Sequence, residues 1–325
     1  MKLGIIGTGM IVDHLLSFIH EIKEIELVHI SSTKRSEEKA IQLMNEHHFK
    51  RYSTNYETLL NDDEVDTIYV ALPNHLHYEY TKKALLKGKN VVLEKPFTAE
   101  LDEALELKEL AIKNHVFLWE AITNQYFPNY IKIKEMLPEL GDIKVVVSNF
   151  SQYSSRYDAF KSGTILPAFD YTKAGGSLMD LNIYNIHFIV GLFGEPKDVH
   201  YFPNIEHNID TSGILILEYD NFKCVCVGAK DCGAPMSNTI QGDKGYIYID
   251  SSLSLVESFD FKLNKEDAVH YNFNEGIHRM YDEFVAFVKM QNENDYETCY
   301  KMLEHSMIVT KVQTIARQKA GIHFK

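Results

Sequence analysis

The sequence predicts an α/β fold in two domains: a doubly wound parallel sheet in residues 1–120, then an α+β domain with an open, mostly antiparallel sheet in residues 121–325. Two observations lead to this prediction. Short apolar runs alternate with helical patterns in the first domain, as in parallel sheets whose strands are joined by right-handed helical crossovers. After Trp119 this alternation stops, and residues 199–263 read as strands joined by short turns. A length of 325 residues also favours two domains.

In the first domain, each predicted strand is a short apolar run, and helical patterns separate the strands. The first helix has apolar residues on one face at Val12, Leu15, Leu16 and Ile19. Gly88 ends a later helix as a C-cap. The sequence predicts strands at 3–6, 26–30, 66–72, 90–94 and 116–119, and further helices at 36–46, 75–87 and 101–114.

The second domain is predicted from strands, turns and amphipathic helices. A helix ends near Pro138, a strand covers 143–150, and a polar, aromatic loop covers 151–174. A long helix starts near Gly175-Gly176, and hairpin turns fall at 220–221 and 242–245. Two amphipathic helices close the chain, with apolar stripes at Ile277, Met280, Tyr281 and Phe284, and at Ile308, Val312 and Ile315.

Composition and charge exclude several classes of partner. The net charge of −13 argues against nucleic acid, whose phosphate backbone needs clustered Lys and Arg. No run approaches the roughly 20 apolar residues that span a bilayer, and no signal peptide opens the chain, so we expect a cytoplasmic protein without a membrane partner. The cysteines form no C-x-x-C pair, and we predict no metal site. Cys224 and Cys226 alternate in an apolar stretch and should be buried free thiols on one face of a strand.

A glycine turn after the first strand predicts a dinucleotide site. Gly7 permits the tight turn, and Gly9 lets the backbone approach a pyrophosphate. Thr8, Met10 and Ile11 complete the turn and open the helix, whose N-terminus presents free amides. The alternative is a structural turn without a ligand.

The end of the second strand decides between the two nicotinamide cofactors. NAD sites usually place an acid there, about 20 residues after the glycines. This chain has Ser32, Thr33, Lys34 and Arg35, and no acid before Glu37. Hydroxyls and cations suit a 2′-phosphate, so NADP is the preferred prediction and NAD the second. Alternatively, Lys34 and Arg35 are only the solvated start of a helix.

Three residues lie at or just after the end of the third strand of the parallel sheet. Leu72, Asn74 and His77 lie where such a fold holds the nicotinamide ribose, and we predict that they contact the cofactor. The alternative for Asn74 is a helix N-cap.

A lysine follows the next strand. Pro96 cannot donate to a ladder, so the strand stops after Glu94 and Lys95 is held at the carboxyl edge of the sheet. We predict that Glu94 and Lys95 belong to the cofactor site, and that Lys95 is also catalytic.

Polar side chains interrupt an otherwise apolar helix. The segment after Gly175-Gly176 is apolar nearly all round, as buried helices are. Asp180, Tyr184 and His187 nevertheless share one face at i, i+4 and i+7. Buried polar groups are costly unless paired, so this stripe is either a structural network or a site. We predict that Asp180 and Tyr184 are catalytic, and leave the role of His187 open.

Together these segments resemble the family of glucose–fructose oxidoreductase, inositol dehydrogenase and the rhizopine-catabolism proteins (Gfo/Idh/MocA) over nearly the whole chain. The resembling segments are G-I-I-G-T-G-M-I at 4–11, A-L-P-N-H-L-H at 71–77, G-K-N-V-V-L-E-K-P-F at 88–97, W-E-A at 119–121 and G-G-S-L-M-D-L-N-I-Y at 175–184.

The resemblance implies an N-terminal Rossmann domain, a second domain whose sheet often forms the oligomer interface, a catalytic Lys95, and a catalytic Asp180 and Tyr184. A tyrosine at position 184 resembles the family branch that contains dimeric dihydrodiol dehydrogenase. Members of that branch tend to use NADP. Two positions depart from the family pattern. Asn182 replaces a frequent Gly, and Gln125 replaces a frequent Arg. The role of Gln125 stays open.

The leading hypothesis is an NADP-preferring oxidoreductase that acts on a secondary alcohol, or its carbonyl, of a small carbohydrate-like substrate such as a sugar, polyol or cyclic diol. A tyrosine hydroxyl is a weak acid, and the Lys95 ammonium would ease its deprotonation. One rival is a cofactor-sensing regulatory protein, and another is a glycosidase with tightly held NAD. The aromatic-rich loop from Phe150 to Tyr171 could line the substrate pocket, with Arg156 and Tyr157 as candidates. We expect a homodimer or larger assembly.

Overall fold

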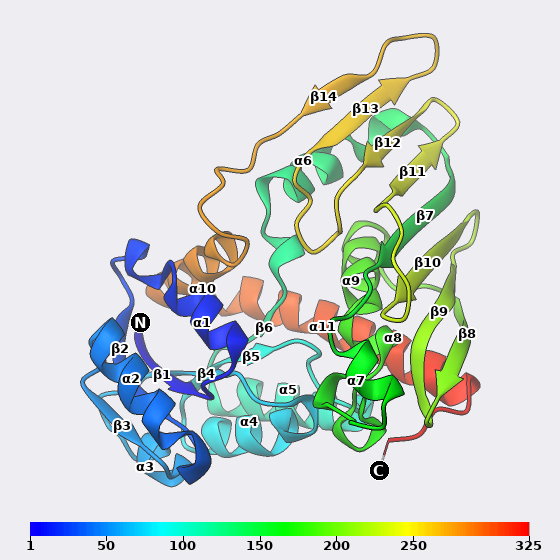
Figure 1. The fold of residues 1–325 in the computed structure, drawn as a ribbon. Coiled ribbons are helices and arrows are strands. Elements are labelled where there is room, and N and C mark those ends of the chain that lie inside the picture. Colours follow the sequence, from blue (N-terminus) through cyan, green and yellow to red (C-terminus); the bar gives the residue numbers. More distant parts are fainter. Residues whose placement is uncertain (325) are drawn as a thin grey trace. The chain divides into compact units, whose positions relative to one another are not determined.

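The computed structural model describes residues 1–324 and contains two compact units (Figure 1). Unit 1 consists of Met1–Ala121 with Met280–Met307, and unit 2 of Ile122–Arg279 with the chain from Ile308 onward. Helix α11 (Tyr296–Lys319) therefore contributes its first half to unit 1 and its second half to unit 2. These units are defined by contacts, and the functional division at residue 120 stays a prediction.

Unit 1 is built on a six-stranded parallel sheet in the order β3-β2-β1-β4-β5-β6. The direction of winding reverses between β1 and β4, so a crevice is expected outside their carboxyl ends. The doubly wound sheet predicted from the sequence is thus confirmed. Its strands are β1 (Lys2–Ile6), β2 (Glu26–Ser31), β3 (Arg51–Ser53), β4 (Thr67–Val70), β5 (Asn90–Glu94) and β6 (Leu118–Ala121).

Helices cover this sheet because its strands are apolar on both faces. The helices are α1 (Met10–Leu16), α2 (Glu37–His47), α3 (Tyr56–Leu60), α4 (His77–Leu86), α5 (Leu101–Asn114) and α10 (Tyr281–Glu293). Helix α5 begins with a capping box between Glu100 and Glu103. From α10, Phe287 stacks on Trp119 at 5.2 Å between ring centroids, which joins this late segment to the core of unit 1.

Several predicted boundaries in unit 1 were wrong. The last strand runs two residues later than predicted, because Val116 and Phe117 precede it as buried loop residues. Helix α10 begins at Tyr281, so Ile277 and Met280 precede it, and Ile277 is 48% exposed. Strand β3 and helix α3 were missed because both are short and carry mixed polarity.

Unit 2 contains an eight-stranded sheet in the order β14-β13-β12-β11-β7-β10-β9-β8. All its pairs are antiparallel except β7 with β10, which confirms the open, mostly antiparallel sheet. Its strands are β7 (Ile143–Ser151), β8 (Asp198–Glu206), β9 (Ile209–Glu218), β10 (Lys223–Ala229), β11 (Asn238–Gly242), β12 (Gly245–Ile249), β13 (Phe259–Leu263) and β14 (Val269–Tyr271).

One face of this sheet packs on helices and buries Cys224 and Cys226 completely, as predicted. The helices of unit 2 are α6 (Pro128–Met136), α7 (Tyr157–Lys161), α8 (Ser177–Asp180) and α9 (Asn182–Phe193). The single long helix predicted after Gly175-Gly176 was wrong, because the chain breaks at Leu181 (φ −108°, ψ −49°). The predicted loop at 151–174 contains α7 and an aromatic cluster of Tyr157, Phe160 and Phe169.

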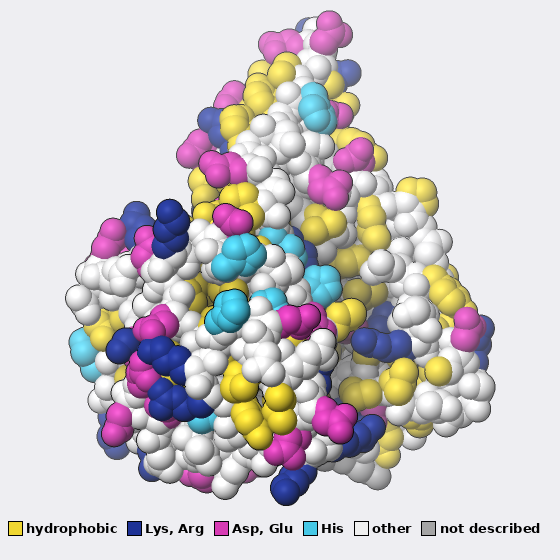
Figure 2. Space-filling model, turned by 60° about the vertical axis from the view of Figure 1, so that its left-hand side comes forward, with side chains coloured by type: hydrophobic (Ala, Val, Ile, Leu, Met, Phe, Trp, Pro, Cys, Tyr) yellow, Lys and Arg dark blue, Asp and Glu magenta, His cyan; other side chains and the backbone are white. Residues whose placement is uncertain are grey.

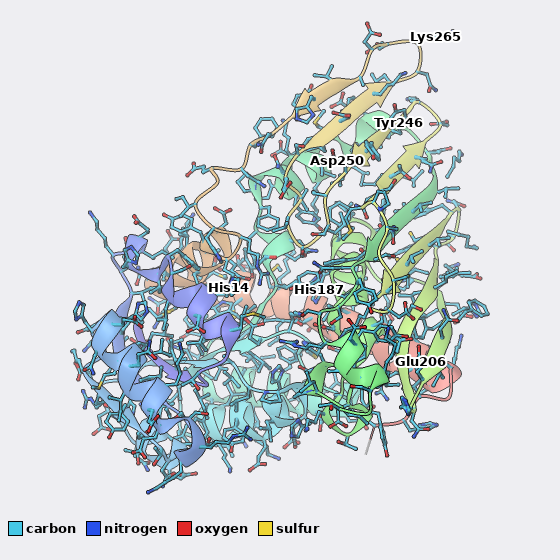
Figure 3. The ribbon with its side chains drawn as sticks, viewed as in Figure 1. His14, His187, Glu206, Tyr246, Asp250 and Lys265 are labelled. Atoms are coloured by element: carbon cyan, nitrogen blue, oxygen red, sulfur yellow. The ribbon has the colours of Figure 1, made fainter. Side chains whose placement is uncertain are left out.

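The other face of the eight-stranded sheet exposes apolar side chains. Ile214 lies opposite Phe202, and their exposed fractions are 45% and 61%. Val145 and Tyr246, the second of which is labelled in Figure 3, both pair with Gln241 and share this face. On the face of the molecule in Figure 2, Lys and Arg side chains stand among Asp and Glu.

Asn182 packs closely against β10 at Gly228. The Asn182 amide donates to the Cys226 carbonyl oxygen at 3.2 Å, and the Asn185 amide donates to the Asn182 side-chain oxygen at 2.9 Å. A Cβ on Gly228 would lie 2.9 Å from the Asn182 Cβ. Gly228 therefore makes room for an asparagine where the resembling family often has glycine.

We expect Gly228→Ala to lower the free energy of unfolding by about 1–3 kcal/mol, because the added methyl group overpacks this contact. Urea denaturation measures the change. Gly233→Ala is the matched control, since its nearest neighbour to a new Cβ is 3.7 Å away. Equal stability of the two variants would contradict the packing argument.

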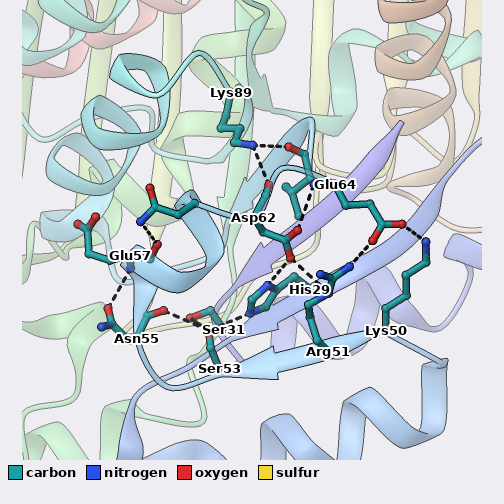
Figure 4. Close-up of polar contacts among 12 residues, drawn as sticks. His29, Ser31, Lys50, Arg51, Ser53, Asn55, Glu57, Asp62, Glu64 and Lys89 are labelled. Carbon is teal, nitrogen blue, oxygen red and sulfur yellow. Dashed lines mark hydrogen bonds and ion pairs between the residues drawn. The ribbon is translucent and has the colours of Figure 1, made fainter.

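A buried polar network joins β2, β3 and the turn before β4 (Figure 4). His29 Nδ1 lies 2.8 Å from the Asp62 carboxylate, and His29 Nε2 lies 2.9 Å from the Ser53 hydroxyl. Ser53 in turn donates to the Ser31 hydroxyl at 3.2 Å. Burial lowers the pKa of His29 more than its contact with Asp62 raises it. His29 is therefore held neutral, and the network fixes the carboxyl ends of β2 and β3.

The free energy of unfolding should fall as the pH drops below about 6.5, the ordinary pKa of histidine. In that range the unfolded chain binds a proton that folded His29 does not, so acid favours unfolding. His29→Asn should make the pH dependence between 7 and 5 shallower, measured by urea denaturation. His20→Asn, at a side chain 69% exposed, is the control. An unchanged slope in His29→Asn would contradict this assignment.

Candidate functional site

A pocket of about 380 Å³ lies in unit 1 at the carboxyl ends of β1, β2 and β4. It occupies the crevice where the strand order reverses, which is the ligand position of such sheets. Seven of the predicted cofactor residues line it: Gly7, Thr8, Gly9, Ser32, Thr33, Lys34 and Leu72.

The two glycines shape this pocket differently. Gly7 has φ +121°, and a Cβ there would lie 2.3 Å from the Ala71 carbonyl oxygen, so no other residue fits. Gly9 has no heavy atom within 4 Å of a Cβ position, which leaves its backbone open towards a ligand. A close backbone approach of this kind fits a dinucleotide pyrophosphate.

The electrostatics of the pocket favour a phosphate. Lys34 is the charged side chain among its described lining residues, and no carboxylate lines it. Hydroxyl groups of Ser32, Thr33, Ser36 and Thr54 surround the same region. Hydroxyls and an ammonium can bind a 2′-phosphate by charge-assisted hydrogen bonds.

Two aromatic residues were missed by the sequence analysis. Tyr56 and Tyr80 line the pocket with ring centroids 4.9 Å apart, and the Tyr56 hydroxyl donates to the Tyr80 carbonyl oxygen at 2.8 Å. Burial raises the pKa of Tyr56 well above its ordinary value. Tyr56 belongs to the short helix α3, which carried no recognisable periodicity in the sequence.

The other predicted cofactor residues lie outside the lining of this pocket. Met10 is 63% exposed at the start of α1, Ile11 follows it, and Arg35 lies in the turn before α2. Asn74 begins the short turn that precedes α4. Their contact with a cofactor stays a prediction.

His77 is fully buried, and both of its ring nitrogens lie within hydrogen-bond distance of backbone carbonyl oxygens. Nδ1 lies 2.8 Å from the Pro96 carbonyl oxygen, and Nε2 lies 2.8 Å from the Leu72 carbonyl oxygen. Burial lowers its pKa. His77 therefore ties the loop after β4 to the loop after β5, and the direct cofactor contact predicted for it stays untested.

Lys95 directly follows β5 in unit 1, is partly exposed, and precedes Pro96 through a cis peptide bond. Its neighbour Glu94 is 8% exposed and accepts a hydrogen bond from the Tyr69 hydroxyl. The lysine thus starts from a rigid strand end, as the sequence analysis expected.

Asp180 and Tyr184 lie in unit 2, on either side of the break at Leu181. Asp180 forms an ion pair with Lys230 at 2.8 Å, and its side chain is 34% exposed. Tyr184 is 7% exposed, and its ring lies 5.9 Å from Phe150. The grouping of Lys95 with these two residues in one site stays a prediction.

The roles of Gln125 and His187 stay open. The Gln125 amide donates to the His187 carbonyl oxygen at 2.9 Å and to the Asn124 side-chain oxygen at 3.1 Å, which anchors α9. His187 is fully buried on α9 (Figure 3).

Lys230 was not predicted, although it directly follows strand β10 as Lys95 directly follows β5. Buried and more exposed residues alternate along β10, whereas four of the five residues of β5 are buried, so the sequence signal at Lys230 is weaker.

Residues 1–324 contain no group of three or more acidic, His or Cys side chains placed to hold a metal ion. Within the same described part of the chain, every helix is too short or too polar to cross a membrane.

Comparison with known proteins identifies the family. Residues 1–122 match the model of the oxidoreductase family with an NAD-binding Rossmann fold, and residues 130–248 match the GFO/IDH/MocA C-terminal domain. The chain is 32% identical over 323 residues to scyllo-inositol 2-dehydrogenase (NADP(+)) IolU of Bacillus subtilis, covering 99% of this chain and 98% of that protein. It is 28% identical to trans-1,2-dihydrobenzene-1,2-diol dehydrogenase of Xenopus laevis, over 86% of each chain.

Solved structures share the fold. The 3-ketoreductase KijD10 from Actinomadura kijaniata, solved with NADP and TDP-benzene, superimposes with a TM-score of 0.84 at 19% identity, covering 98% of this chain and 97% of that one. With the glycine turn, the pocket and both matching domains in place, the chain belongs to the Gfo/Idh/MocA family of NAD(P)-dependent oxidoreductases.

Proposed function

We propose that this enzyme interconverts a secondary alcohol and a carbonyl on a cyclic polyol, diol or sugar, with NADP as the preferred cofactor. The observation that carries the proposal is the full-length similarity to an NADP-dependent inositol dehydrogenase, at 32% identity. A dihydrodiol dehydrogenase is also similar over most of its length. These relatives act on hydroxyl groups of small, oxygen-rich molecules, and the substrate proposed here belongs to that chemical class.

The preference for NADP is supported by the pocket. Its described lining brings the Lys34 ammonium together with the hydroxyl groups of Ser32, Thr33, Ser36 and Thr54, and contains no carboxylate. An acid at the end of β2 would hydrogen-bond the ribose of NAD and repel the 2′-phosphate of NADP. Gly7, Gly9, Ser32, Thr33 and Lys34 would hold the adenosine and pyrophosphate portion.

In the proposed mechanism, the bound nicotinamide supplies or accepts the hydride at the carbinol carbon. Tyr184 takes the hydroxyl proton during oxidation and returns it to the carbonyl oxygen during reduction. Lys95 stabilises the negative charge that develops on the tyrosine and on the substrate oxygen. Asp180 orients the substrate hydroxyl. Bringing Lys95 to Asp180 and Tyr184 is part of this proposal.

Lys95→Ala should lower kcat by about 10²–10³-fold, the usual cost of removing one group that stabilises developing negative charge. Cofactor affinity, measured by NADPH fluorescence, should change little because Lys95 lies outside the lining of the pocket. Lys87→Ala, at an exposed lysine of unit 1, is the control. Turnover can be assayed with scyllo-inositol, a trans-dihydrodiol and D-xylose.

Wild-type turnover in Lys95→Ala would contradict the catalytic assignment. Tight cofactor binding by the wild type without turnover of any alcohol or carbonyl would favour a cofactor-sensing protein. Cofactor that stays bound through purification, without net consumption, would favour a glycosidase that uses transient oxidation.

We also propose a homo-oligomer in the cytoplasm. The exposed apolar face of the eight-stranded sheet, which includes Phe202 and Ile214, suits self-association. Cys232 is an exposed free thiol, which suits a reducing compartment.

Ile214→Glu should shift the assembly towards monomer, because it places a charge on this apolar face. Light scattering after gel filtration measures the molar mass. Ile112→Glu is the control, at a residue that is equally exposed (45%) on α5 of unit 1. A monomeric wild type, or an unchanged mass in Ile214→Glu, would contradict the proposed interface.

A further inference from the structure

Lys230 is a buried cation that the proposed mechanism does not use. Its side chain is 2% exposed, and its Nζ donates to the Asp180 carboxylate at 2.8 Å and to the Ala168 carbonyl oxygen at 2.7 Å. The same ammonium lies 4.4 Å from the centroid of the Phe169 ring. All of these groups belong to unit 2.

The backbone of Lys230 is fixed as firmly as its side chain. Its amide donates to the Thr211 carbonyl oxygen at 2.8 Å, and its carbonyl accepts from the Ser154 amide at 2.9 Å. Lys230 therefore connects β9, the segment at 151–174 and the end of α8. Because hydrogen bonds hold both its backbone and its side chain, the Lys230 ammonium has a fixed position and limits where the Asp180 carboxylate can lie.

Other acids near Lys230 are engaged elsewhere. Asp210 is fully buried, and accepts from the Leu178 amide and the Tyr201 hydroxyl, each at 2.7 Å. Burial raises the pKa of Asp210 to about 6, although Lys230 opposes this. Asp231 accepts from the hydroxyls of Thr211 and Ser212, each at 2.7 Å. Among the described residues, the ion-pair partner of Lys230 is Asp180.

Stability alone is a weak reason for such a pair. Desolvating an ammonium costs several kcal/mol, and apolar replacements of buried ion pairs are often neutral or stabilising. Here the ammonium is buried, whereas the Asp180 side chain keeps a third of its surface exposed. A buried cation that fixes a partly exposed carboxylate is the arrangement expected where a reaction needs the charge and the orientation of that carboxylate.

We propose that Lys230 is a positioning residue for the reaction. It keeps Asp180 ionised, fixes the direction of its carboxylate, and couples that direction to the segment at 151–174 through Ala168. This inference rests on the proposed role of Asp180 in catalysis.

The test compares Lys230→Met, Lys230→Arg, Asp180→Asn and the double variant Asp180→Asn/Lys230→Met. Lys230→Met should lower kcat/KM for the alcohol about 100-fold, as a misplaced catalytic group does, and leave NADPH affinity unchanged. The acidic limb of its pH profile should move to higher pH, because the lost ammonium no longer favours the carboxylate. Lys230→Arg should keep the limb in place. Lys223→Met, at an exposed lysine at the start of β10, is the control.

The double variant decides whether Lys230 acts through Asp180. Its kcat/KM should be no lower than that of Asp180→Asn, because the lysine has no further effect once its partner is neutral. Multiplicative losses would overturn the inference, as would a Lys230→Met profile that matches the wild type while Asp180→Asn loses turnover. Wild-type turnover in Asp180→Asn would instead overturn the proposed catalytic role itself.

Folding is followed by thermal melting and by NADPH binding. Should Lys230→Met not fold, Lys230→Arg decides: an acidic limb at the wild-type position supports the inference, and a limb displaced to higher pH overturns it.

Discussion

The close contact between Gly7 and the backbone of Ala71 is the constraint on which unit 1 depends. A carbonyl oxygen stands 2.3 Å from the position that any Cβ on Gly7 would occupy. The chain therefore turns at positive φ directly after β1, beside the end of β4, where the strand order reverses. This turn opens the pocket, and the loops after β2 and β4 complete its lining. Any other residue at Gly7 would force the backbone at this turn or at Ala71 to shift.

The lysines to which we assign roles lie at or shortly after the ends of strands. Lys34 follows β2, Lys95 follows β5, and Lys230 follows β10. At the end of a strand the backbone is held by the sheet, and this restricts the positions that the charged group of a long side chain can occupy. His29 and His77 act in support of this arrangement, because their rings tie neighbouring strand ends together through short hydrogen bonds. Function in this fold therefore depends on fixed loops at the edge of a rigid sheet.

Much of this arrangement could be predicted from the sequence. The parallel sheet, the glycine turn and seven residues of the pocket lining follow from patterns that extend over several turns or strands. The contribution of Tyr56 could not be predicted, because it depends on where the short α3 lies on the sheet. Tyr80 lies on the predicted helix α4, but its place in the lining depends on its packing against Tyr56. The break at Leu181 also escaped prediction, because the apolar periodicity continues through it and only the backbone angles reveal it.

The ion-pair partner of Asp180 could not be predicted from the sequence either. Within unit 2, Asp180 contacts Lys230, which lies fifty residues further along the chain and was not among the predicted site residues. Pairing of residues so far apart follows from the topology of the eight-stranded sheet, which composition and periodicity do not define. Asn182 and Gly228 form a comparable pair, since the departure from the family pattern at one position is accommodated at the other.

The central claim is that the pocket at the glycine turn selects NADP through Lys34 and its neighbouring hydroxyls. Fluorescence titration of the purified enzyme with NADPH and, separately, with NADH tests it directly. A hydrogen bond to a charged group contributes about 1.5–3 kcal/mol, so we expect NADPH to bind about 10- to 100-fold more tightly than NADH. Equal affinity, or tighter binding of NADH, would contradict the claim.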